Sequence, residues 1–479
     1  MRVVHIEDFF HPNAGYQINI LPKYMVKKGI ETFIITSEIE KVPTNLTAFF
    51  GKKNLDFYDS EFERMTGIKI IRVPVKRFIS SRAIFTNKLY QVVENLSPDA
   101  LFVHGNDTFI GMKYIWKQKK LKCALISDSH MLEMASVNKF NKIFRKFYKT
   151  FITPKIIKNK LIVIRTQDDT YVNKCLGIPI EQSPWISYGS DTLLFHPNKQ
   201  VKRQFRIDNN LSEDTFIILY AGKLDKSKGG MFLAESIKDK FITKRKIAFV
   251  IIGNTAGDYG KKVEKLFSDS ENTVLRFSTQ RYVDLAKFFQ SADLAVFPKQ
   301  CSLSFFDAQA SGLPVVFENN NINVDRCKHN NGFVFKAGDK ADFRKKIQYC
   351  IDMNGYDYKK IQKNAYEYII NNYDYSKKAD AYIEKIKESI DLFNKKNNKY
   401  IKDRTILEES SKKNIRVLHF TSKLSAGGVQ SFLINYAKNI NKNEVVFDYV
   451  VQTKQEAEFD KLVKNNGSII YNVTSIEDS

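Results

Sequence analysis

Residues 297–317 read FPKQCSLSFFDAQASGLPVVF, and this stretch predicts a strand, a helix and a second strand in close succession. The first apolar run is followed by Ser302 and Ser304, whose side chains favour the capping position of a helix. Asp307 then falls about one turn into that helix, and Gly312 leads towards the next apolar run. Strand–helix–strand units of this kind build parallel sheets.

The same alternation extends over most of the 479 residues. The apolar runs are RVVHI, TFIIT, IKIIRVPV, ALFVHG, CALISDSH, LIVIRT, FIILYAG, IAFVIIG, TVLRFS, LAVFP and LPVVF, with longer amphipathic segments between them. A cluster of Gly, Ser, Asp and Pro at 187–197, SYGSDTLLFHP, interrupts the series as a connector. We therefore predict an α/β chain with two Rossmann-like domains, residues 1–190 and 191–372.

The C-terminal part repeats the beginning of the chain. A helix is predicted over 373–392 and a polar linker over 393–413. Residues 414–479 then open with RVLHFTSKLSAGG, which is similar to RVVHIEDFFHPNAG near the N-terminus. About 65 residues cannot hold the six or so strands of a complete domain, so we expect a partial third Rossmann-like unit.

Composition limits the function classes. The formal net charge of +23 favours acidic partners such as nucleotides, anionic lipid or nucleic acid. A Lys-rich composition bias explains the charge better than a dedicated nucleic-acid role does, because no nucleic-acid motif accompanies it. The five cysteines are isolated, which argues against disulfides or a zinc knuckle and favours a reducing compartment. No signal peptide and no apolar run of about 18 residues is visible. We expect a cytoplasmic protein without a nucleic-acid partner.

Candidate sites lie in the loops that follow strands, because ligands of open parallel sheets bind beyond the carboxyl ends of the strands. Ala14 and Gly15, in HPNAGYQ, would let a backbone approach a ligand, although an ordinary tight turn explains the pair equally well. His104 and His130 end two successive strands. A lone histidine is usually a packing or capping residue, but two at neighbouring strand ends favour a shared site.

The loop 221–230, AGKLDKSKGG, follows the first strand of the second domain. Lys223 and Lys228 could close on two phosphates while the glycines leave room, although both could equally be solvated surface charges. Asp307 could accept hydrogen bonds from ribose hydroxyls, or it could merely stabilise the first turn of its helix.

Taken together and in this order, these segments resemble the GT-B glycosyltransferases of family 4, which are retaining and use nucleotide-diphosphate sugars. The loop AGKLDKSKGG looks like the phosphate-binding turn of that family, and FPKQCSLSFFDAQASGLPVV looks like its E-x7-E region. SYGSDTLLFHP, VIIGN, ADLAVFP and HPNAGYQ are similar to further motifs of the family. The resemblance implies a GT-B fold, in which an acceptor-side N-terminal domain and a nucleotide-sugar-binding C-terminal domain face each other across a cleft. It also implies that 414–479 is the truncated start of a second such transferase.

The resemblance assigns roles to individual residues. Lys223 and Lys228 would neutralise the diphosphate, Asp307 would hold the ribose, and His104 would contact the donor sugar. The remaining expected donor-binding residues are Gly15, Gly222, Gly253, Gln300, Ser302, Leu303 and Ser304, and the expected acceptor-side residues are Tyr16, Gln17 and His130. No metal and no cofactor other than the nucleotide-sugar substrate is expected.

Three departures from the family pattern leave two functions open. Lys223 replaces an arginine, Asp307 replaces a glutamate, and the segment before Asp307 is about three residues shorter than the E-x7-E pattern, so Gln300 or Ser302 would take the sugar contact. The first function is sugar transfer to a saccharide or lipid-linked acceptor in surface polysaccharide or glycolipid assembly. The second is a catalytically weak homologue that binds nucleotide sugar or acts as a partner subunit. A nicotinamide-dependent oxidoreductase is a distant third, since no G-x-G-x-x-G follows a strand.

The segment 139–160, KFNKIFRKFYKTFITPKIIKNK, carries eight basic residues and no acidic one. Its aromatic and aliphatic side chains follow helical spacing, which suits a peripheral contact with the anionic inner face of a membrane. Packing of the same stripe against the domain core explains the pattern equally well.

Overall fold

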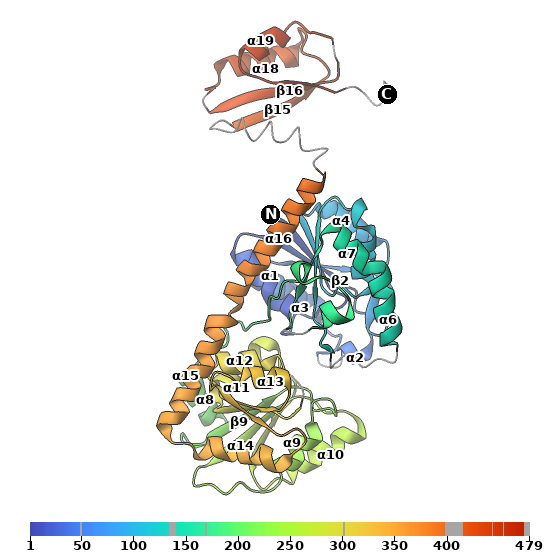
Figure 1. The fold of residues 1–479 in the computed structure, drawn as a ribbon. Coiled ribbons are helices and arrows are strands. Elements are labelled where there is room, and N and C mark those ends of the chain that lie inside the picture. The colour runs from blue at the N-terminus through green and yellow to red at the C-terminus, as the bar shows by residue number, and fades with distance from the viewer. Residues whose placement is uncertain are drawn as a thin grey trace. The chain divides into compact units, whose positions relative to one another are not determined.

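A computed structural model describes residues 1–47, 50–133, 140–167, 170–299, 302–397, 415–442, 444–453 and 455–473. The chain divides into two units, Met1–Phe393 and Asn394–Ser479. The first unit contains two Rossmann-like domains (Figure 1), as the alternating apolar runs predicted.

The N-terminal domain is built on a six-stranded parallel sheet of order β3-β2-β1-β6-β7-β8. Its strands are β1 (Arg2–Ile6), β2 (Glu31–Ser37), β3 (Lys69–Val73), β6 (Ala100–Val103), β7 (Ala124–Ser129) and β8 (Ile162–Arg165). The antiparallel hairpin β4 (Val75–Ile79) and β5 (Arg82–Phe85) was not predicted. β6 and β7 are buried along their whole length, as expected for central strands of a covered parallel sheet.

The helices of this domain are α1 (Gln17–Lys27), α2 (Thr44–Thr47), α3 (Leu55–Thr66), α4 (Lys88–Leu96), α5 (Phe109–Lys117), α6 (Asn141–Phe147) and α7 (Thr153–Asn159). A π-helical turn at Tyr148–Ile152 joins α6 to α7. Within the described ranges, no helix combines the length and the apolar composition needed to cross a membrane.

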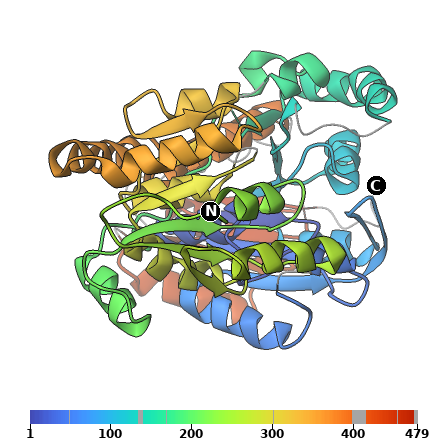
Figure 2. The same cartoon turned by 90° about the horizontal axis from the view of Figure 1, so that it is seen from below.

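The C-terminal domain repeats the same strand order, β11-β10-β9-β12-β13-β14. Its strands are β9 (Phe216–Ala221), β10 (Ile247–Ile252), β11 (Thr273–Phe277), β12 (Leu294–Phe297), β13 (Val315–Glu318) and β14 (Gly332–Phe335), the last of which was not predicted. Helices cover both faces of this sheet (Figure 1 and Figure 2). They are α8 (Lys199–Asp208), α9 (Gly230–Ser236), α10 (Gly257–Ser268), α11 (Tyr282–Ser291), α12 (Ser304–Ala310), α13 (Asn321–Arg326), α14 (Lys340–Asp352) and α15 (Gly355–Asn372).

The chain crosses between these two domains twice, and the two crossings lie side by side. Ser190 forms a parallel bridge with Asp374, and the Ser190 N–H donates to the carbonyl oxygen of Tyr373 over 2.8 Å. A Cβ on Gly189 would lie 2.2 Å from the same carbonyl oxygen, so only glycine fits there. Asp191 ties the first crossing to α1, because it accepts hydrogen bonds from Lys23 and Tyr24.

The final helix of this unit, α16 (Tyr375–Asn397), returns to the N-terminal domain. Tyr375, Tyr382 and Ile386 are buried in one cluster with Val3 and Phe102 of the first sheet. The helix runs beyond the predicted 373–392, so the first five residues of the predicted linker 393–413 are helical. Residues 398–413 lie outside the described residues.

The second unit contains a three-stranded parallel sheet, β15 (Ile415–Thr421), β16 (Val445–Val451) and β17 (Ile470–Asn472), with helices α18 (Gly428–Asn439) and α19 (Asp460–Asn465). Its order corresponds to β1-β2-β3 of the first domain. β1 pairs on both sides, whereas β15, among the described residues, pairs with β16 alone. Ile6 of β1 is accordingly buried, and Phe420 at the corresponding place in β15 is 77% exposed.

Candidate functional site

The candidate site lies in the first unit, where the carboxyl ends of the central strands of both sheets meet. Two adjacent pockets occur there, and both are lined by Ala14, Tyr16, Gln17, Tyr188 and Leu303. One pocket extends towards the C-terminal domain and the other into the N-terminal domain. This is the place at which open parallel sheets bind ligands.

Most of the predicted donor residues line the first pocket. It brings Gly15, Tyr16, Gln17, Gly222, Lys223, Gly253, Leu303, Ser304 and Asp307 together. Ser302 and Lys228 lie outside its lining, and Gln300 lies outside the described residues. Residues from two domains and from four separate stretches of the chain thus meet in one cavity, which the sequence order alone does not show.

Two glycines allow close approach in this pocket. A Cβ on Gly253 would lie 2.0 Å from the carbonyl oxygen of Gly222, so the loops after β9 and β10 touch through their backbones. A Cβ on Gly15 would lie 2.0 Å from the ring of Tyr282, which belongs to the other domain. The Tyr282 N–H also donates to the carbonyl oxygen of Asn13 over 2.9 Å. The two domains are therefore in direct contact at the glycine turn.

Asp307 is buried at the back of the same pocket. Its Oδ1 accepts hydrogen bonds from Ser190 Oγ over 2.6 Å and from Tyr282 OH over 3.2 Å. Burial raises the pKa of Asp307 to about 7, and the two hydroxyl donors only partly oppose that rise. The expected capping is wrong, however. The N-cap residue of α12 is Leu303 and no side chain caps the helix, so Ser302 and Ser304 do not serve that purpose.

The lysine loop is held in shape by Asp225. Its carboxylate accepts hydrogen bonds from Ser227 Oγ over 2.6 Å and from the Lys228 N–H over 3.0 Å. Burial would raise the pKa of Asp225, but these hydrogen bonds outweigh burial and lower it. Lys223 lines the pocket, whereas Lys228 stands one residue before the turn at Gly229 that begins α9.

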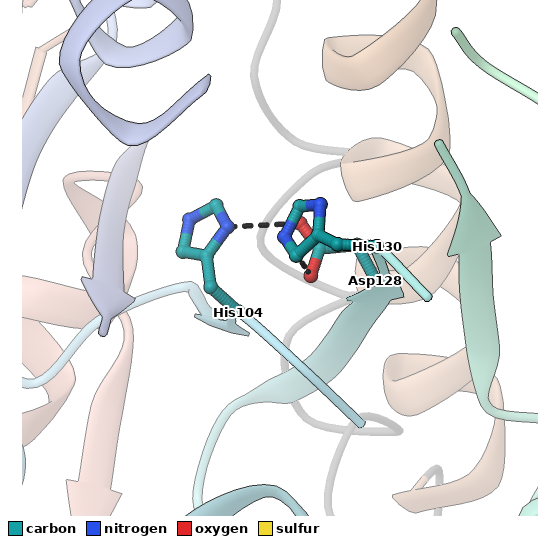
Figure 3. Close-up of side chains that lie close together, drawn as sticks. All are labelled: His104, Asp128 and His130. Atoms are coloured by element: carbon teal, nitrogen blue, oxygen red, sulfur yellow. Dashed lines mark hydrogen bonds and ion pairs between the residues drawn. The ribbon is translucent and has the colours of Figure 1, made fainter. Parts of the chain in front are cut away.

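The second pocket contains a buried network centred on Asp128 (Figure 3), a residue that the sequence analysis did not single out. Asp128 Oδ2 accepts from His104 Nδ1 over 2.8 Å, and Oδ1 accepts from His130 Nε2 over 3.1 Å. The Gly105 N–H donates to Oδ1 as well, over 2.8 Å. Behind them, His5 Nδ1 lies 2.9 Å from His104 Nε2. Because Asp128 accepts from His104 Nδ1, the other nitrogen of His104 can accept from His5.

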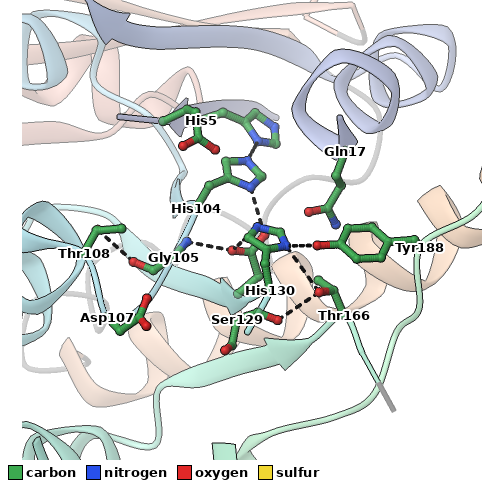
Figure 4. A network of polar contacts seen from close by, with 12 residues as sticks. His5, Gln17, His104, Gly105, Asp107, Thr108, Ser129, His130, Thr166 and Tyr188 are labelled. Carbon is green, nitrogen blue, oxygen red and sulfur yellow. Dashed lines mark hydrogen bonds and ion pairs between the residues drawn. The ribbon is translucent and has the colours of Figure 1, made fainter. Parts of the chain in front are cut away.

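His130 is the member of this network that reaches the cleft. Its side chain is 33% exposed, whereas those of His104 and Asp128 are fully buried. Its Nδ1 contacts Tyr188 OH and lies 3.2 Å from Thr166 Oγ1 (Figure 4). His104 therefore stands behind His130, although the second pocket touches both.

The charges of the network follow from burial and from Asp128. Burial would raise the pKa of Asp128, but His130 and His104 outweigh burial and hold it well below its usual range. Burial would lower the pKa of His130, but Asp128 and Glu7 raise it. Burial also lowers the pKa of His5 well below its usual value. The arrangement therefore favours a neutral His5 and a carboxylate at Asp128, and it stabilises the positively charged form of His130.

The same three residues have the composition of a metal site. The nitrogen and oxygen atoms of His104, Asp128 and His130 lie within 4.8 Å of one another, and such atoms suit a divalent ion. In this structure those atoms hydrogen-bond to each other, so we interpret the cluster as a hydrogen-bonded network.

The basic segment packs one side against the domain core and exposes the other. Tyr148, Ile152 and Ile156 are buried in the core of the N-terminal domain, with Phe144 packed against it. On the other side of the same helices, apolar side chains are exposed, namely Phe140, Ile143, Phe147, Phe151 and Ile157. Lys139, the first residue of the segment, lies outside the described residues.

Comparisons of sequence find that part of the chain is similar to known glycosyltransferases. Residues 201–368 match the family described as Glycosyl transferases group 1. The D-inositol 3-phosphate glycosyltransferase of Pseudarthrobacter chlorophenolicus is 28% identical over 137 residues, which are 27% of this chain and 32% of that protein. The lipopolysaccharide 1,2-N-acetylglucosaminetransferase of Salmonella typhimurium is 24% identical over 138 residues, 26% of this chain and 35% of that protein. The chain thus spans about a third of the length of these curated relatives.

Solved structures with similar folds include known glycosyltransferases. A glycosyltransferase from Rickettsia africae matches with a TM-score of 0.64 at 16% identity, covering 81% of this chain and 98% of that one. An Anabaena protein, HepE, solved in complex with UDP and glucose, matches with a TM-score of 0.62 at 14% identity, covering 81% of this chain and all of that one. The first unit therefore has the GT-B fold predicted from the sequence, and residues 201–368 of it are similar to the family described as Glycosyl transferases group 1.

Proposed function

We propose that this protein is a retaining glycosyltransferase of family 4, which moves a sugar from a nucleotide-diphosphate sugar to a saccharide or lipid-linked acceptor. The observation that carries the proposal is the first pocket, where Gly15, Lys223 and Asp307 meet between the two domains. Lys223 would supply a cation for the phosphates, and Asp307 a carboxylate for the ribose hydroxyls. Gly15 would let the backbone approach the nucleotide sugar closely.

In the proposed reaction, the bond between the sugar and the leaving phosphate breaks while the acceptor oxygen bonds the same carbon on the same face. The proton of the acceptor hydroxyl passes to the leaving phosphate. Lys223 and Lys228 stabilise the negative charge that develops on the diphosphate. A reaction of this kind requires no nucleophile from the protein. A protonated His130 at the wall of the second pocket would place a positive charge beside the bound sugar, with Asp128 holding its ring. Contact between Gly15 and Tyr282 closes the cleft and limits access of water.

The second candidate function is a catalytically weak homologue that binds nucleotide sugar or acts as a partner subunit. Its support is the shortened segment before Asp307, where the first glutamate of the family pattern has no clear counterpart. Transfer of label from a bound nucleotide sugar to an acceptor distinguishes the two functions, because both predict binding and only the first predicts transfer.

Nucleotide binding tests the pocket directly. We expect calorimetric titration of the full chain to give saturable binding of one of UDP, GDP and ADP. Lys223→Ala and Lys228→Ala should each weaken it tenfold or more, about 1.4 kcal/mol. Lys226→Ala is the matched control, since Lys226 lies on the same loop with its ammonium near the Tyr259 ring. No binding of any of the three nucleotides, or equal losses in all three variants, would contradict the proposed diphosphate site.

We also propose that the exposed face of α6, the π-helical turn and α7 contacts an anionic membrane surface. Phe147 and Phe151 are 44% and 48% exposed and pack on each other, with ring centroids 5.3 Å apart. Flanking lysines would meet lipid phosphates while these rings enter the interface. Such a contact would place the enzyme at a lipid-linked acceptor, in surface polysaccharide or glycolipid assembly on the cytoplasmic side.

Vesicle sedimentation tests this contact. Vesicles with about a third of phosphatidylglycerol should bind the protein, and the binding should weaken with salt. The double variant Phe147→Ser/Phe151→Ser should reduce the bound fraction several-fold. Ile242→Ser is the matched control, because Ile242 is 94% exposed and lies in the C-terminal domain. Equal binding by both variants would exclude the helix face as the contact.

A further inference from the structure

A third pocket lies at the opposite end of the first sheet from the cleft. Its walls come from α4, from α5 and from the residues that directly precede β6 and β7, including Pro98 and Cys123. His104 and His130, by contrast, follow the carboxyl ends of those same two strands. The pocket has a volume of about 310 Å³, which is near the lower end of the range for small-molecule sites.

The interior of this pocket is apolar. Val93, Pro98 and Cys123 are buried, and the rings of Tyr90 and Tyr114 lie against each other with centroids 5.5 Å apart. An apolar lining of this kind takes up hydrocarbon or ring systems through the hydrophobic effect.

The rim of the pocket is cationic. Lys113, Lys117, Lys120 and Lys122 line it against a single acid, Glu94, which gives four positive charges to one negative. Glu94 is already paired with Lys122 over 3.0 Å at the surface. The Lys113 ammonium lies 4.3 Å from the centroid of the Tyr90 ring, and burial, then the charges of Lys117 and Lys76, lower the pKa of Lys113. An anion at this rim would relieve the repulsion among these lysines.

One polar atom inside the pocket wall lacks a partner. Tyr114 is 2% exposed, and its hydroxyl has no hydrogen-bond partner among the described residues. A buried hydroxyl without a partner costs about 1–3 kcal/mol. A ligand whose head group offers an oxygen acceptor to this hydroxyl would recover that cost.

We propose that this pocket is a second ligand site, which binds an amphiphilic anion with an apolar chain inside and a phosphate or carboxylate head at Lys113 and Lys117. The pocket combines the three features that such a ligand needs: an apolar interior, uncompensated positive charge at the mouth and a buried donor. The site is separate from the cleft and does not depend on the proposed transferase activity.

Calorimetric titration of the full chain with octyl phosphate tests this site. We expect saturable binding that is at least tenfold tighter than that of neutral octyl glucoside, with no measurable binding of inorganic phosphate. Octanoate compares the two head groups, and whichever binds more tightly identifies the natural head. If octyl glucoside bound as tightly as octyl phosphate, the cationic rim would contribute nothing to binding. If inorganic phosphate bound as tightly as octyl phosphate, the apolar interior would contribute nothing. Either result would overturn the proposal.

Variants locate the binding. Lys113→Gln/Lys117→Gln should weaken octyl phosphate binding tenfold or more, whereas Lys119→Gln, in the 3-10 turn Gln118–Lys120 that follows α5 and outside the lining, should not. Binding that survives the double variant but is lost in Phe147→Ser/Phe151→Ser would place the ligand on the α6–α7 face and overturn the proposal.

A separate variant tests the contact of the ligand with the Tyr114 hydroxyl. Tyr114→Phe should raise the thermal midpoint of the free protein, since it removes a buried unpaired group, and should also weaken octyl phosphate binding. An unchanged affinity would overturn the assignment of Tyr114 as a ligand contact.

Discussion

Replacing Asp128 with asparagine is expected to destabilise the N-terminal domain by about 3–5 kcal/mol, the usual effect of removing one charge from a buried pair. Asp128 is fully buried and joins His104 and His130. Asparagine keeps the shape but removes the charge that raises the pKa of His130. We therefore expect the pKa of His130 to fall and its positively charged form to be less populated, and we expect sugar transfer to fall at least tenfold.

Two measurements check this expectation. Urea unfolding should show a lower midpoint for the domain, and NMR of ring-labelled histidine should show a resonance that titrates above about 6.5 in the parent and below it in Asp128→Asn. Asp258→Asn is the matched control, because Asp258 is 91% exposed and pairs with an exposed lysine. Unchanged histidine titration in Asp128→Asn would mean that Asp128 does not set the charge of His130.

The same network predicts how stability depends on pH. The folded pKa of Asp128 is lowered, so its contribution is present above about pH 4 and is lost as pH falls. The folded pKa of His130 is raised, so its contribution is present below about pH 6.5 and is lost as pH rises through the folded value. Together, Asp128 and His130 should stabilise the parent most between about pH 4 and pH 6.5. Burial lowers the folded pKa of His5, so its contribution opposes that of His130 and is lost as pH falls below about 6.5. Asp128→Asn should flatten the part of the dependence that Asp128 and His130 produce.

The second large effect is expected at Gly15. In Gly15→Ala the new methyl group would lie 2.0 Å from the Tyr282 ring, so either the ring or the whole glycine turn must move. Overpacking of this kind costs about 1–3 kcal/mol. Because the two residues belong to different domains, we expect the cleft to open and nucleotide affinity to fall tenfold or more.

A double-mutant cycle isolates this contact. Tyr282→Ala removes the obstacle, so Gly15→Ala should have little further effect in that background. Gly355→Ala is the matched control, since a Cβ there meets nothing within 4 Å. Small-angle scattering should show a larger radius of gyration for Gly15→Ala only. If the parent and Gly15→Ala scatter and bind nucleotide alike, the Tyr282 ring moves aside and the contact does not control closure.

Most strands could be predicted because they are continuous apolar runs, and such runs occur where both faces of a parallel sheet are covered. The hairpin β4–β5 was missed because VKRFI and RAIF mix basic and apolar residues, as partly exposed strands do. β14 was missed because GFVF is only four residues long and begins with glycine. Its pairing with β13 stabilises it, and pairing between distant segments leaves no local signal.

Part of the candidate site could likewise be predicted from the sequence, and part could not. Loops rich in glycine and lysine could be found in the sequence, because they carry local signals for turns and anions. Asp128, Tyr188 and Tyr282 carry no such signal, and they act on residues far along the chain. The bond from Ser190 to Asp307 spans 117 positions. A histidine at a strand end could be recognised, but the position of His130 in front of His104 depends on the side chains packed around both.

The paired crossings at Ser190 and Asp374 have a mechanical consequence. Two interdomain connections at separate places would resist any rotation between the domains, whereas a single connection would allow rotation in all directions. Two connecting segments that lie side by side and hydrogen-bond to each other allow rotation mainly about one axis, which passes through both segments. Since Asp191 is tied to α1, that axis is anchored to the N-terminal domain. The C-terminal domain should therefore swing as a rigid body, and Asp307, which is hydrogen-bonded to Ser190 beside the axis, should move little.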